Sequence, residues 1–226
     1  MKHFLIFLLL PLAFSCRTGE MMVQEPSKKK EGSIAIKKVI SIAPDFQFLD
    51  PRLSPSQAIE KQYQKRQGYL ELLASSAQEA GVELEIYDPA LKNNADAAYF
   101  NELLPLREKV FQVNKLQPVP LSIHRNHRGF NRFPLTFGME KPILMESDFS
   151  YLAEKYGTPY FAVQGFYNLR FNRLFIPVHQ SMMYHVLIDV TRGEIIYREI
   201  RVMPNGFKPE IVRPIFFDSY AILQNL

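Results

Sequence analysis

Several residue types that mark familiar protein classes are scarce in this chain of 226 residues. It contains 1 cysteine, which excludes a framework of intrachain disulfides, and it contains no tryptophan. Its 10 glycines do not cluster into a phosphate-binding loop. No apolar run reaches the ~20 residues of a membrane-spanning helix. The formal net charge of +4 is too small for a dedicated nucleic-acid-binding protein, so we expect no nucleic-acid partner.

The remaining composition is that of a folded globular protein. Hydrophobic residues make up 47% and charged residues 22% of the chain. The 18 phenylalanines and 11 tyrosines supply aromatic bulk in place of tryptophan. A chain of this size can bury a sizeable core without disulfides or metal ions. We therefore expect a single globular domain over residues 34–226.

The first fifteen residues have the pattern of a secretory signal peptide. The basic start Met1–His3 precedes the apolar run Phe4–Phe14, which is too short to span a membrane. The segment Leu12–Cys16 then resembles the lipobox of bacterial lipoproteins, in which signal peptidase II cleaves before the cysteine and the cysteine receives acyl chains. The alternative is a signal peptide of the ordinary type I, with Cys16 there by chance.

The lipobox resemblance implies that Cys16 carries a lipid anchor and that the chain has a membrane as its first partner. Each buried CH₂ of an acyl chain contributes ~0.8 kcal/mol, so several chains anchor a protein firmly. Arg17, where an aspartate would favour retention in the inner membrane, implies the outer membrane of a bacterial cell. Residues 16–33, which include Lys28–Lys30, show no apolar period and predict a flexible tether.

The patterns beyond residue 33 predict an α/β domain, with an α+β domain as the alternative. The β-branched stretch 34–43 indicates a buried strand, which Pro44 and Asp45 are expected to end. A second strand is expected at 82–87, where apolar and polar residues alternate. Two strands joined by a helix are usually parallel neighbours. The sequence thus predicts an N-terminal βαβ unit in a mixed, three-layered domain.

The helix between these strands has clear start and stop signals. Ser54, Pro55 and Gln57 fit an N-cap, a first-turn proline and a capping box, and Gly81 fits the stop. Six residues at helical spacing form one apolar face, which we expect to enter the core. They are Ile59, Tyr63, Leu70, Leu73, Ala74 and Ala77.

The rest of the chain predicts short helices and an antiparallel hairpin. An apolar stripe over Tyr99–Val113 indicates a helix that Pro105 kinks or divides, and a short helix is expected to end at Gly157. Strands are expected at 160–167, 183–190 and 194–202. Thr191–Gly193 suits the hairpin turn between the last two, and Pro214 is expected to start a closing helix.

Two motifs in the C-terminal half carry a further resemblance. The first is a strand that ends in glycine, Tyr160–Gly165, and the second is the hairpin Asp189–Glu194. Within Leu152–Ile200 they resemble the α/β domain of the curli-secretion lipoprotein, the penicillin-binding-protein activator lipoproteins and the N-terminal domain of the Tol translocation protein. The physical alternative is that any such turn favours Asp, Thr and Gly. The resemblance implies a role in assembly, secretion or wall-synthesis support, and it implies no catalytic residues.

Two basic and aromatic stretches, 123–133 and 168–175, are the most unusual parts of the sequence. Arginine matches carboxylate and phosphate geometry, and arginine and aromatic residues are enriched at interfaces. We therefore expect an anionic ligand, a glycan or a protein partner to bind here. The candidate residues are His124, Arg125, His127, Arg128, Arg132, Arg170 and Arg173. The alternative is a pair of solvated loops whose phenylalanines point inward.

No nucleophile or metal motif appears, so the sequence predicts no cofactor, no metal ion and no catalytic residue. We expect a non-enzymatic envelope lipoprotein, periplasmic or surface-facing, that binds an envelope protein or a second copy of itself. One alternative is an envelope hydrolase. Asp45 and Asp88 follow parallel strands, where α/β proteins place sites, although turns also favour Asp. The hydrolase alternative requires Asp45 and Asp88 to lie in one pocket with the His/Arg loop 124–132. The other alternative is a lipoprotein with an apolar pocket for a small ligand.

Overall fold

The computed structural model describes residues 21–24, 35–50, 52–88, 99–113, 149–173, 176–203 and 208–225. In chain order their elements are β1 (Met21–Gln24), β2 (Lys38–Ile42), β3 (Asp45–Leu49), α2 (Pro55–Glu79), β4 (Glu83–Tyr87), the π-helical turn η1 (Tyr99–Leu103), α3 (Leu104–Val113), α4 (Tyr151–Tyr156), β5 (Tyr160–Arg173), β6 (Ile176–Asp189), β7 (Glu194–Met203), α5 (Pro209–Ala221) and the 3₁₀ turn η4 (Ile222–Asn225).

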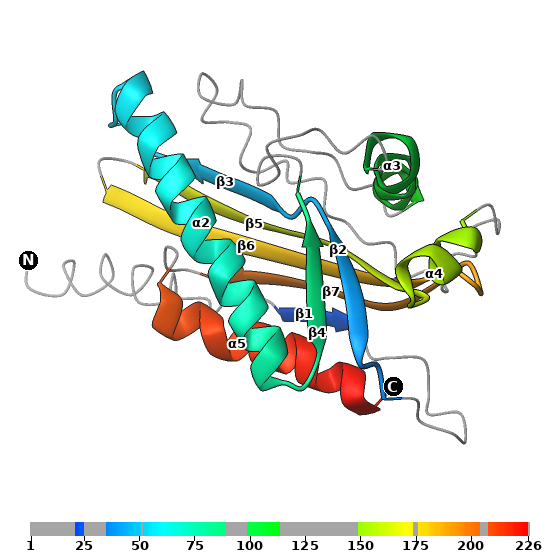
Figure 1. Cartoon of the computed structure of the whole chain (residues 1–226). Helices are drawn as coiled ribbons and strands as arrows, with labels where there is room; N and C mark the ends of the chain where they lie inside the picture. Colours follow the sequence, from blue (N-terminus) through cyan, green and yellow to red (C-terminus); the bar gives the residue numbers. More distant parts are fainter. Residues whose placement is uncertain are drawn as a thin grey trace, which may run out of the picture.

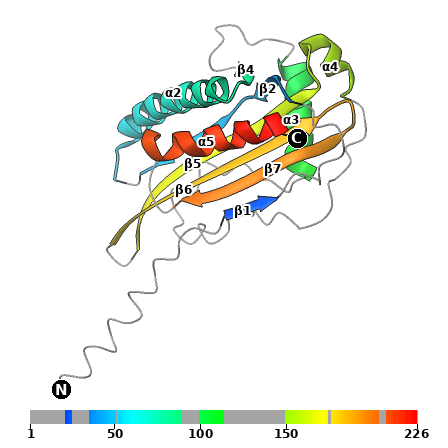
Figure 2. The ribbon, with the colours of Figure 1, turned by 90° about the horizontal axis from the view of Figure 1, so that it is seen from below.

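These elements form the predicted α/β domain, built in three layers around a mixed sheet. The described strands make one seven-stranded sheet in the order β1-β7-β6-β5-β2-β4, with β3 beside β5. Helices α2 and α5 cover one face (Figures 1 and 2), and their apolar side chains share a core with that face. Helices α3 and α4 contribute to a second core on the opposite face.

The predicted βαβ unit is confirmed. Strands β2 and β4 are parallel, with Lys38 opposite Glu83 and Ile42 opposite Tyr87. Helix α2 joins them and begins with the expected capping box. Ser54 Oγ accepts from the N–H of Gln57, and the Gln57 side chain accepts from the N–H of Ser54. The helix ends before Gly81, whose φ of 76° lies in the left-handed region that suits glycine.

The strand predicted at 34–43 is shorter than expected, and Asp45 does not end the extended region. Strand β2 stops at Ile42, and Ala43 turns the chain with a φ of 36°. The chain then continues as β3, whose residues Asp45–Leu49 pair in parallel with β5 at Gly165–Leu169. Strand β2 meets β5 further back, at Phe161 and Ala162. One bend therefore lets two successive strands share a single long neighbour.

The apolar face of α2 is only half buried. Leu70 and Leu73 are 4% and 2% exposed, whereas Ile59 and Tyr63 are 71% and 69% exposed. The prediction that the whole face enters the core is therefore wrong for Ile59 and Tyr63, and also for Ala74, which is exposed. For Ile59 and Tyr63 the physical reason is the length of the helix. Helix α2 has 25 residues, and α5 lies beside its C-terminal half alone (Figure 1).

Strands β5, β6 and β7 form an antiparallel meander. Strands β5 and β6 pair along 14 residues each, from Tyr160 opposite Asp189 to Arg173 opposite Ile176. One alternative for residues 168–173 was a solvated loop. They form the end of β5 instead, because their backbone pairs with β6. The turn after β6 is the predicted one. Asp189 Oδ1 accepts from the N–H of Thr191 at 3.0 Å, and Gly193 has a φ of 65°.

Prolines occupy different positions in helices α3 and α5. Pro105 is the second residue of α3, and the π-helical turn η1 precedes that helix, so the predicted division of this region is confirmed. Pro214 lies inside α5, and the prediction that it starts the helix is wrong. Pro209 starts it instead, because a missing N–H has no consequence in the first turn.

Strand β1 lies within the segment predicted to be a flexible tether. Its residues Met21–Gln24 pair antiparallel with Arg198–Arg201 of β7, which gives these four residues backbone partners. Cys16 and the other tether residues lie outside the described part of the chain. Of the helices in the described ranges, none has the length and apolar character needed to cross a membrane.

Candidate functional site

Two clusters of polar side chains lie against the sheet, one at the ends of the parallel strands and one beneath α5. We call the first the strand-end cluster; it consists of Asp45, Arg66, Asp88, Arg107 and Tyr184. We call the second the helix-face row; it consists of Ser41, Gln164, His185 and Glu199.

In the strand-end cluster, Asp45 is held by donors from two other elements. Arg107 of α3 donates through Nη2 to Asp45 Oδ1 at 2.5 Å, and the hydroxyl of Tyr184 on β6 donates to Oδ2 at 2.6 Å. Burial raises the pKa of the Asp45 carboxyl, although the Arg107 guanidinium opposes this. Asp45 therefore ties a helix and a distant strand to the start of β3, which is a tertiary role and not that of a turn residue.

Tyr184 reaches Asp45 by crossing Gly165 of the intervening strand. The three residues are neighbours in register, since Gly165 lies opposite Asp45 on one side and opposite Tyr184 on the other. A Cβ atom added at Gly165 would lie 2.4 Å from Cε1 of Tyr184, which is too close for any side chain. Glycine in the middle of β5 is thus required by the tyrosine ring.

Asp88, which follows β4, has an arginine of its own. Its buried carboxylate pairs with Arg66 of α2. Arg66 also acts on Asp45, where its charge opposes the rise in pKa. The structure therefore brings Asp45 and Asp88 to the same end of the parallel strands, as predicted, but each is paired with a guanidinium. His124 and Arg125, which the hydrolase hypothesis adds to this site, lie outside the described residues.

The helix-face row crosses the sheet beneath α5. Gln164 of β5 lies opposite His185 of β6, and His185 lies opposite Glu199 of β7. Each of the four side chains is at most 3% exposed. Gln164 donates to Ser41 Oγ of β2 at 2.8 Å and accepts from the Tyr220 hydroxyl of α5 at 3.0 Å. The row therefore links β2, β5 and α5 by hydrogen bonds.

Glu199 is a buried carboxylate with several donors. The Tyr197 hydroxyl donates to Oε2 at 2.8 Å and the Ser219 hydroxyl at 2.6 Å, while Arg201 pairs with Oε1. Burial raises the pKa of Tyr197 to about 12, so this phenol stays a donor at neutral pH. A buried charge is tolerated only when its hydrogen-bonding capacity is filled, and Glu199 meets this condition.

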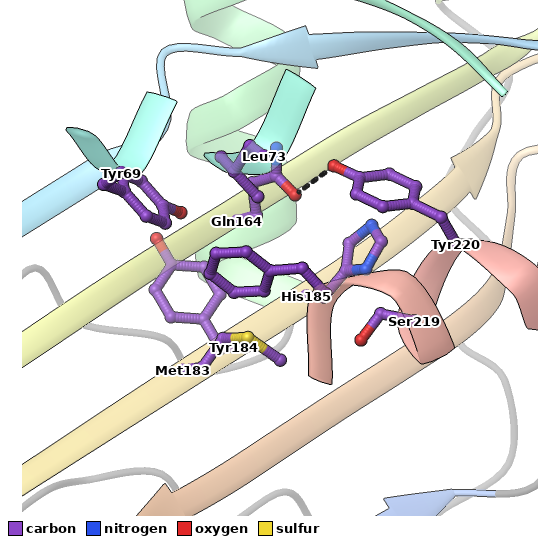
Figure 3. A pocket seen from close by; sticks show the side chains of 9 residues that line it. Tyr69, Leu73, Gln164, Met183, Tyr184, His185, Ser219 and Tyr220 are labelled. Carbon is purple, nitrogen blue, oxygen red and sulfur yellow. Dashed lines mark hydrogen bonds between the residues drawn. The ribbon is translucent and has the colours of Figure 1, made fainter. Parts of the chain in front are cut away.

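A small cavity lies beside Gln164 and His185 of the row, between the sheet and helices α2 and α5 (Figure 3). Its lining residues are Tyr69, Leu73, Gln164, Met183, Tyr184, His185, Phe216, Ser219 and Tyr220. The cavity offers about 10 Å³ to the centre of a water molecule, whereas ligand pockets usually measure ~300–1,000 Å³. This cavity therefore gives no support to the small-ligand alternative.

Burial governs the chemistry of His185. Its ring lies against Tyr197 and Tyr220, with ring centroids 5.7 Å and 5.4 Å away. Burial lowers the pKa of the imidazole to about 4, so His185 is neutral at physiological pH. His185 lies in β6, within the strand predicted at 183–190. Within the described ranges there is no group of three or more side chains that could hold a metal ion.

None of the predicted binding residues is among the members of the two clusters. Those outside the described ranges are Cys16, His124, Arg125, His127, Arg128 and Arg132. Arg170 and Arg173 belong to β5, where their backbones pair with His179 and Ile176 of β6. Arg107, Tyr184 and Glu199 were not predicted as site residues from the sequence. A glycine inside a strand was the one available signal, since it marks a close approach such as that of Tyr184.

Comparisons with known proteins show distant likeness. No protein-family model matches the chain, and no curated protein matches its sequence. Two structures of the PelC dodecamer from Paraburkholderia phytofirmans are 9% identical to it, with TM-scores of 0.42 and 0.40, and the matches cover 92% of this chain and 99% of theirs. A structure described as a putative neuraminyllactose-binding hemagglutinin homologue from Helicobacter pylori is also 9% identical, with a TM-score of 0.30, over 89% of this chain and 86% of that one.

Proposed function

We propose that this chain is a non-enzymatic lipoprotein of the bacterial cell envelope. Its acylated Cys16 holds it at the outer membrane, and its α/β domain binds another envelope component, either a protein or a second copy of the chain. The resemblance of Leu152–Ile200 to envelope lipoproteins supports a role in assembly, secretion or wall-synthesis support.

The observation that carries the non-enzymatic part is the pairing of the candidate carboxylates. Asp45 is bonded to Arg107 and Tyr184, and Asp88 to Arg66. A general base must be able to reach and take a proton from a substrate. Here the carboxylate oxygens accept from guanidinium and phenol groups that hold elements of the fold together. This arrangement supports an architectural role for both acids.

Two features support the binding part. Ile59 and Tyr63 are large apolar residues one turn apart on α2, and both are mostly exposed. The basic and aromatic stretch 123–133 supplies arginines of the kind that are enriched at interfaces. We place the partner contact on this stretch, with the exposed turn of α2 as a second candidate surface.

The anchor is tested by metabolic labelling with palmitate. Cys16→Ser should abolish incorporation of the label and release the chain from the membrane fraction. Ser15→Ala is the matched control, because it keeps a small residue before the cysteine and should retain the label. Equal labelling of both variants would contradict the lipid anchor.

The binding function is tested on lipidated protein extracted gently from its own envelope. We expect a stoichiometric partner or a discrete oligomer in the native mass. Arg125→Glu, Arg128→Glu and Arg132→Glu together should abolish partner capture or oligomer formation without changing thermal stability. The control is a triple reversal at exposed lysines of the described domain, Lys37, Lys61 and Lys208. A monomer with nothing bound, or capture equally reduced by both triple variants, would contradict the proposal.

A further inference from the structure

The imidazole of His185 has one ring nitrogen without a hydrogen-bond partner. The residue is 2% exposed, and Nε2 is buried and unpaired within the described part of the molecule. Buried polar atoms in folded proteins are nearly always hydrogen-bonded, either to protein or to ordered water. An imidazole nitrogen in this position therefore calls for a partner.

The space beside His185 is the right size for such a partner. His185 lines the cavity between α2, α5 and the sheet, which offers about 10 Å³ to the centre of a water molecule. A cavity of roughly 10–15 Å³ on this measure holds one water. It is too small for an organic ligand, so size restricts the occupant to water or an ion of similar size. A neutral imidazole among phenol and amide groups offers no charge to bind an ion.

The polar groups that a water needs stand at the same end of the cavity. Figure 3 shows Gln164, His185 and Tyr220 together, with Tyr69 on the other side. The ring centroids of His185 and Tyr220 are 5.4 Å apart, and the Tyr220 hydroxyl donates to Gln164 at 3.0 Å. A hydroxyl that donates once keeps lone pairs that can accept, and the Gln164 amide, which uses one N–H on Ser41, has a second.

We propose that this cavity is a binding site for a single water molecule, which bridges Nε2 of His185 to the Gln164–Tyr220 pair. The bridge completes the helix-face row. It ties the His185 side chain of β6 to the side chains of Gln164 on β5 and Tyr220 on α5. The inference stands independently of the proposed function, because it uses only the described core.

The test is a crystal structure of the full chain at a resolution that shows ordered water, with His185→Phe as the variant. We expect density within about 2.7–3.2 Å of Nε2 that also contacts Gln164 or Tyr220. His185→Phe should abolish this density, and Tyr220→Phe, which keeps the ring and removes one partner, should reduce its occupancy. A dry cavity, or Nε2 bonded directly to a protein group, would overturn the proposal.

A second measurement covers the case in which His185→Phe does not fold. In the unmodified full chain, labelled with ¹⁵N-histidine and held in detergent, the ring protons of His185 should show a magnetisation transfer from a long-lived water. Loss of that transfer in Tyr220→Phe, with the imidazole signals otherwise retained, would support the bridge. Its absence from the unmodified chain would contradict it.

Discussion

The strand-end cluster and the helix-face row each hold an acidic side chain largely away from solvent, and they differ in where the partners of that side chain come from. Each contains an acidic side chain paired with an arginine and a tyrosine. The partners of Asp45 come from positions 62 and 139 residues away, whereas Tyr197 and Arg201 lie 2 residues from Glu199 on its own strand. Glu199 is 1% exposed, and the Asp45 side chain is 25% exposed. Glu199 is thus the more deeply buried of these two acids, and its partners lie on its own strand and at Ser219 of α5, whereas Asp45 joins distant elements at a more open edge.

The difference in burial between the two carboxylates predicts which cluster contributes more to the stability of the fold. A deeply buried carboxylate loses more solvation than one near the surface, so removing its partners leaves a larger penalty. The helix-face row should therefore govern global stability. The strand-end cluster should govern how α3 and β6 are held at the ends of the parallel strands.

The largest effect is expected when the charge of the helix-face row is removed. Glu199→Ala leaves Arg201 and two hydroxyls without their acceptor, which should lower the free energy of unfolding by about 3–5 kcal/mol. Urea denaturation followed by circular dichroism measures the change. Glu210→Ala, at an exposed position in the first turn of α5, is the control and should change stability far less. Equal effects would contradict the view that the burial of Glu199 causes the loss.

A slightly smaller loss is expected from the strand-end cluster. Gly165→Ala places a Cβ 2.4 Å from the Tyr184 ring and should lower the free energy of unfolding by up to about 3 kcal/mol. Tyr184→Ala is itself destabilising, but in that background Gly165→Ala should cost much less, since the clash is gone. Gly68→Ala is the matched control. It lies in α2 with nothing within 4 Å and should raise stability by about 0.5–1 kcal/mol. No coupling between positions 165 and 184 would refute the close approach.

The pH dependence of stability distinguishes the two clusters without any mutation in the strand-end cluster. The pKa of His185 is about 4 in the folded protein and 6.5 in an unfolded chain, so the unfolded state binds a proton first as pH falls. Stability should therefore decrease from about pH 6.5 towards pH 4, by about 2 kcal/mol at pH 5. The raised pKa of Asp45 acts in the opposite sense, because its folded form holds the proton more readily. His185→Phe should flatten the decrease, and an unchanged slope would contradict a buried neutral imidazole.

The smallest effect is expected on the exposed half of α2. Ile59→Ser and Tyr63→Ser should change the free energy of unfolding by less than about 0.5 kcal/mol, because both side chains are mostly in solvent. Leu73→Ala on the buried half of the same helix should lower it by about 2–5 kcal/mol. Thermal unfolding of the three variants measures the contrast. Similar losses in all three would show that the exposed turn is covered in the folded chain.

Local signals in the sequence proved to be good guides. Ser54, Pro55 and Gln57 predicted the start of α2, because capping depends on neighbours three residues apart. Gly157 and Gly193 predicted a helix end and a turn, since both positions need a positive φ. Prediction was poorer where two options satisfied the same local rule. Pro209 and Pro214 both suit a first helical turn, and the wrong one was chosen.

The candidate site was harder to predict than the fold. Asp45 and Asp88 were placed together correctly, since the ends of parallel strands meet at one edge. Arg66 and Arg107 were not recognised as their partners, because a charged residue on an amphipathic helix has the same pattern whether it faces solvent or a buried acid. Ile59 and Tyr63 were misplaced for a related reason. Periodicity shows which face of a helix is apolar and does not show where the neighbouring element ends.

Although β1 and β3 could not be predicted from the sequence, most helices and strands of this protein, their order and the parallel pairing of β2 with β4 could be. These depend on capping, turns and periodicity, which act over a few residues. Three further features could be seen only in the folded structure: β3 pairs with β5, Tyr184 crosses Gly165 to reach Asp45, and Glu199 is buried. Each of these facts depends on contacts between segments far apart in the chain or on the depth at which a strand is covered. Neither is encoded in any short window of residues.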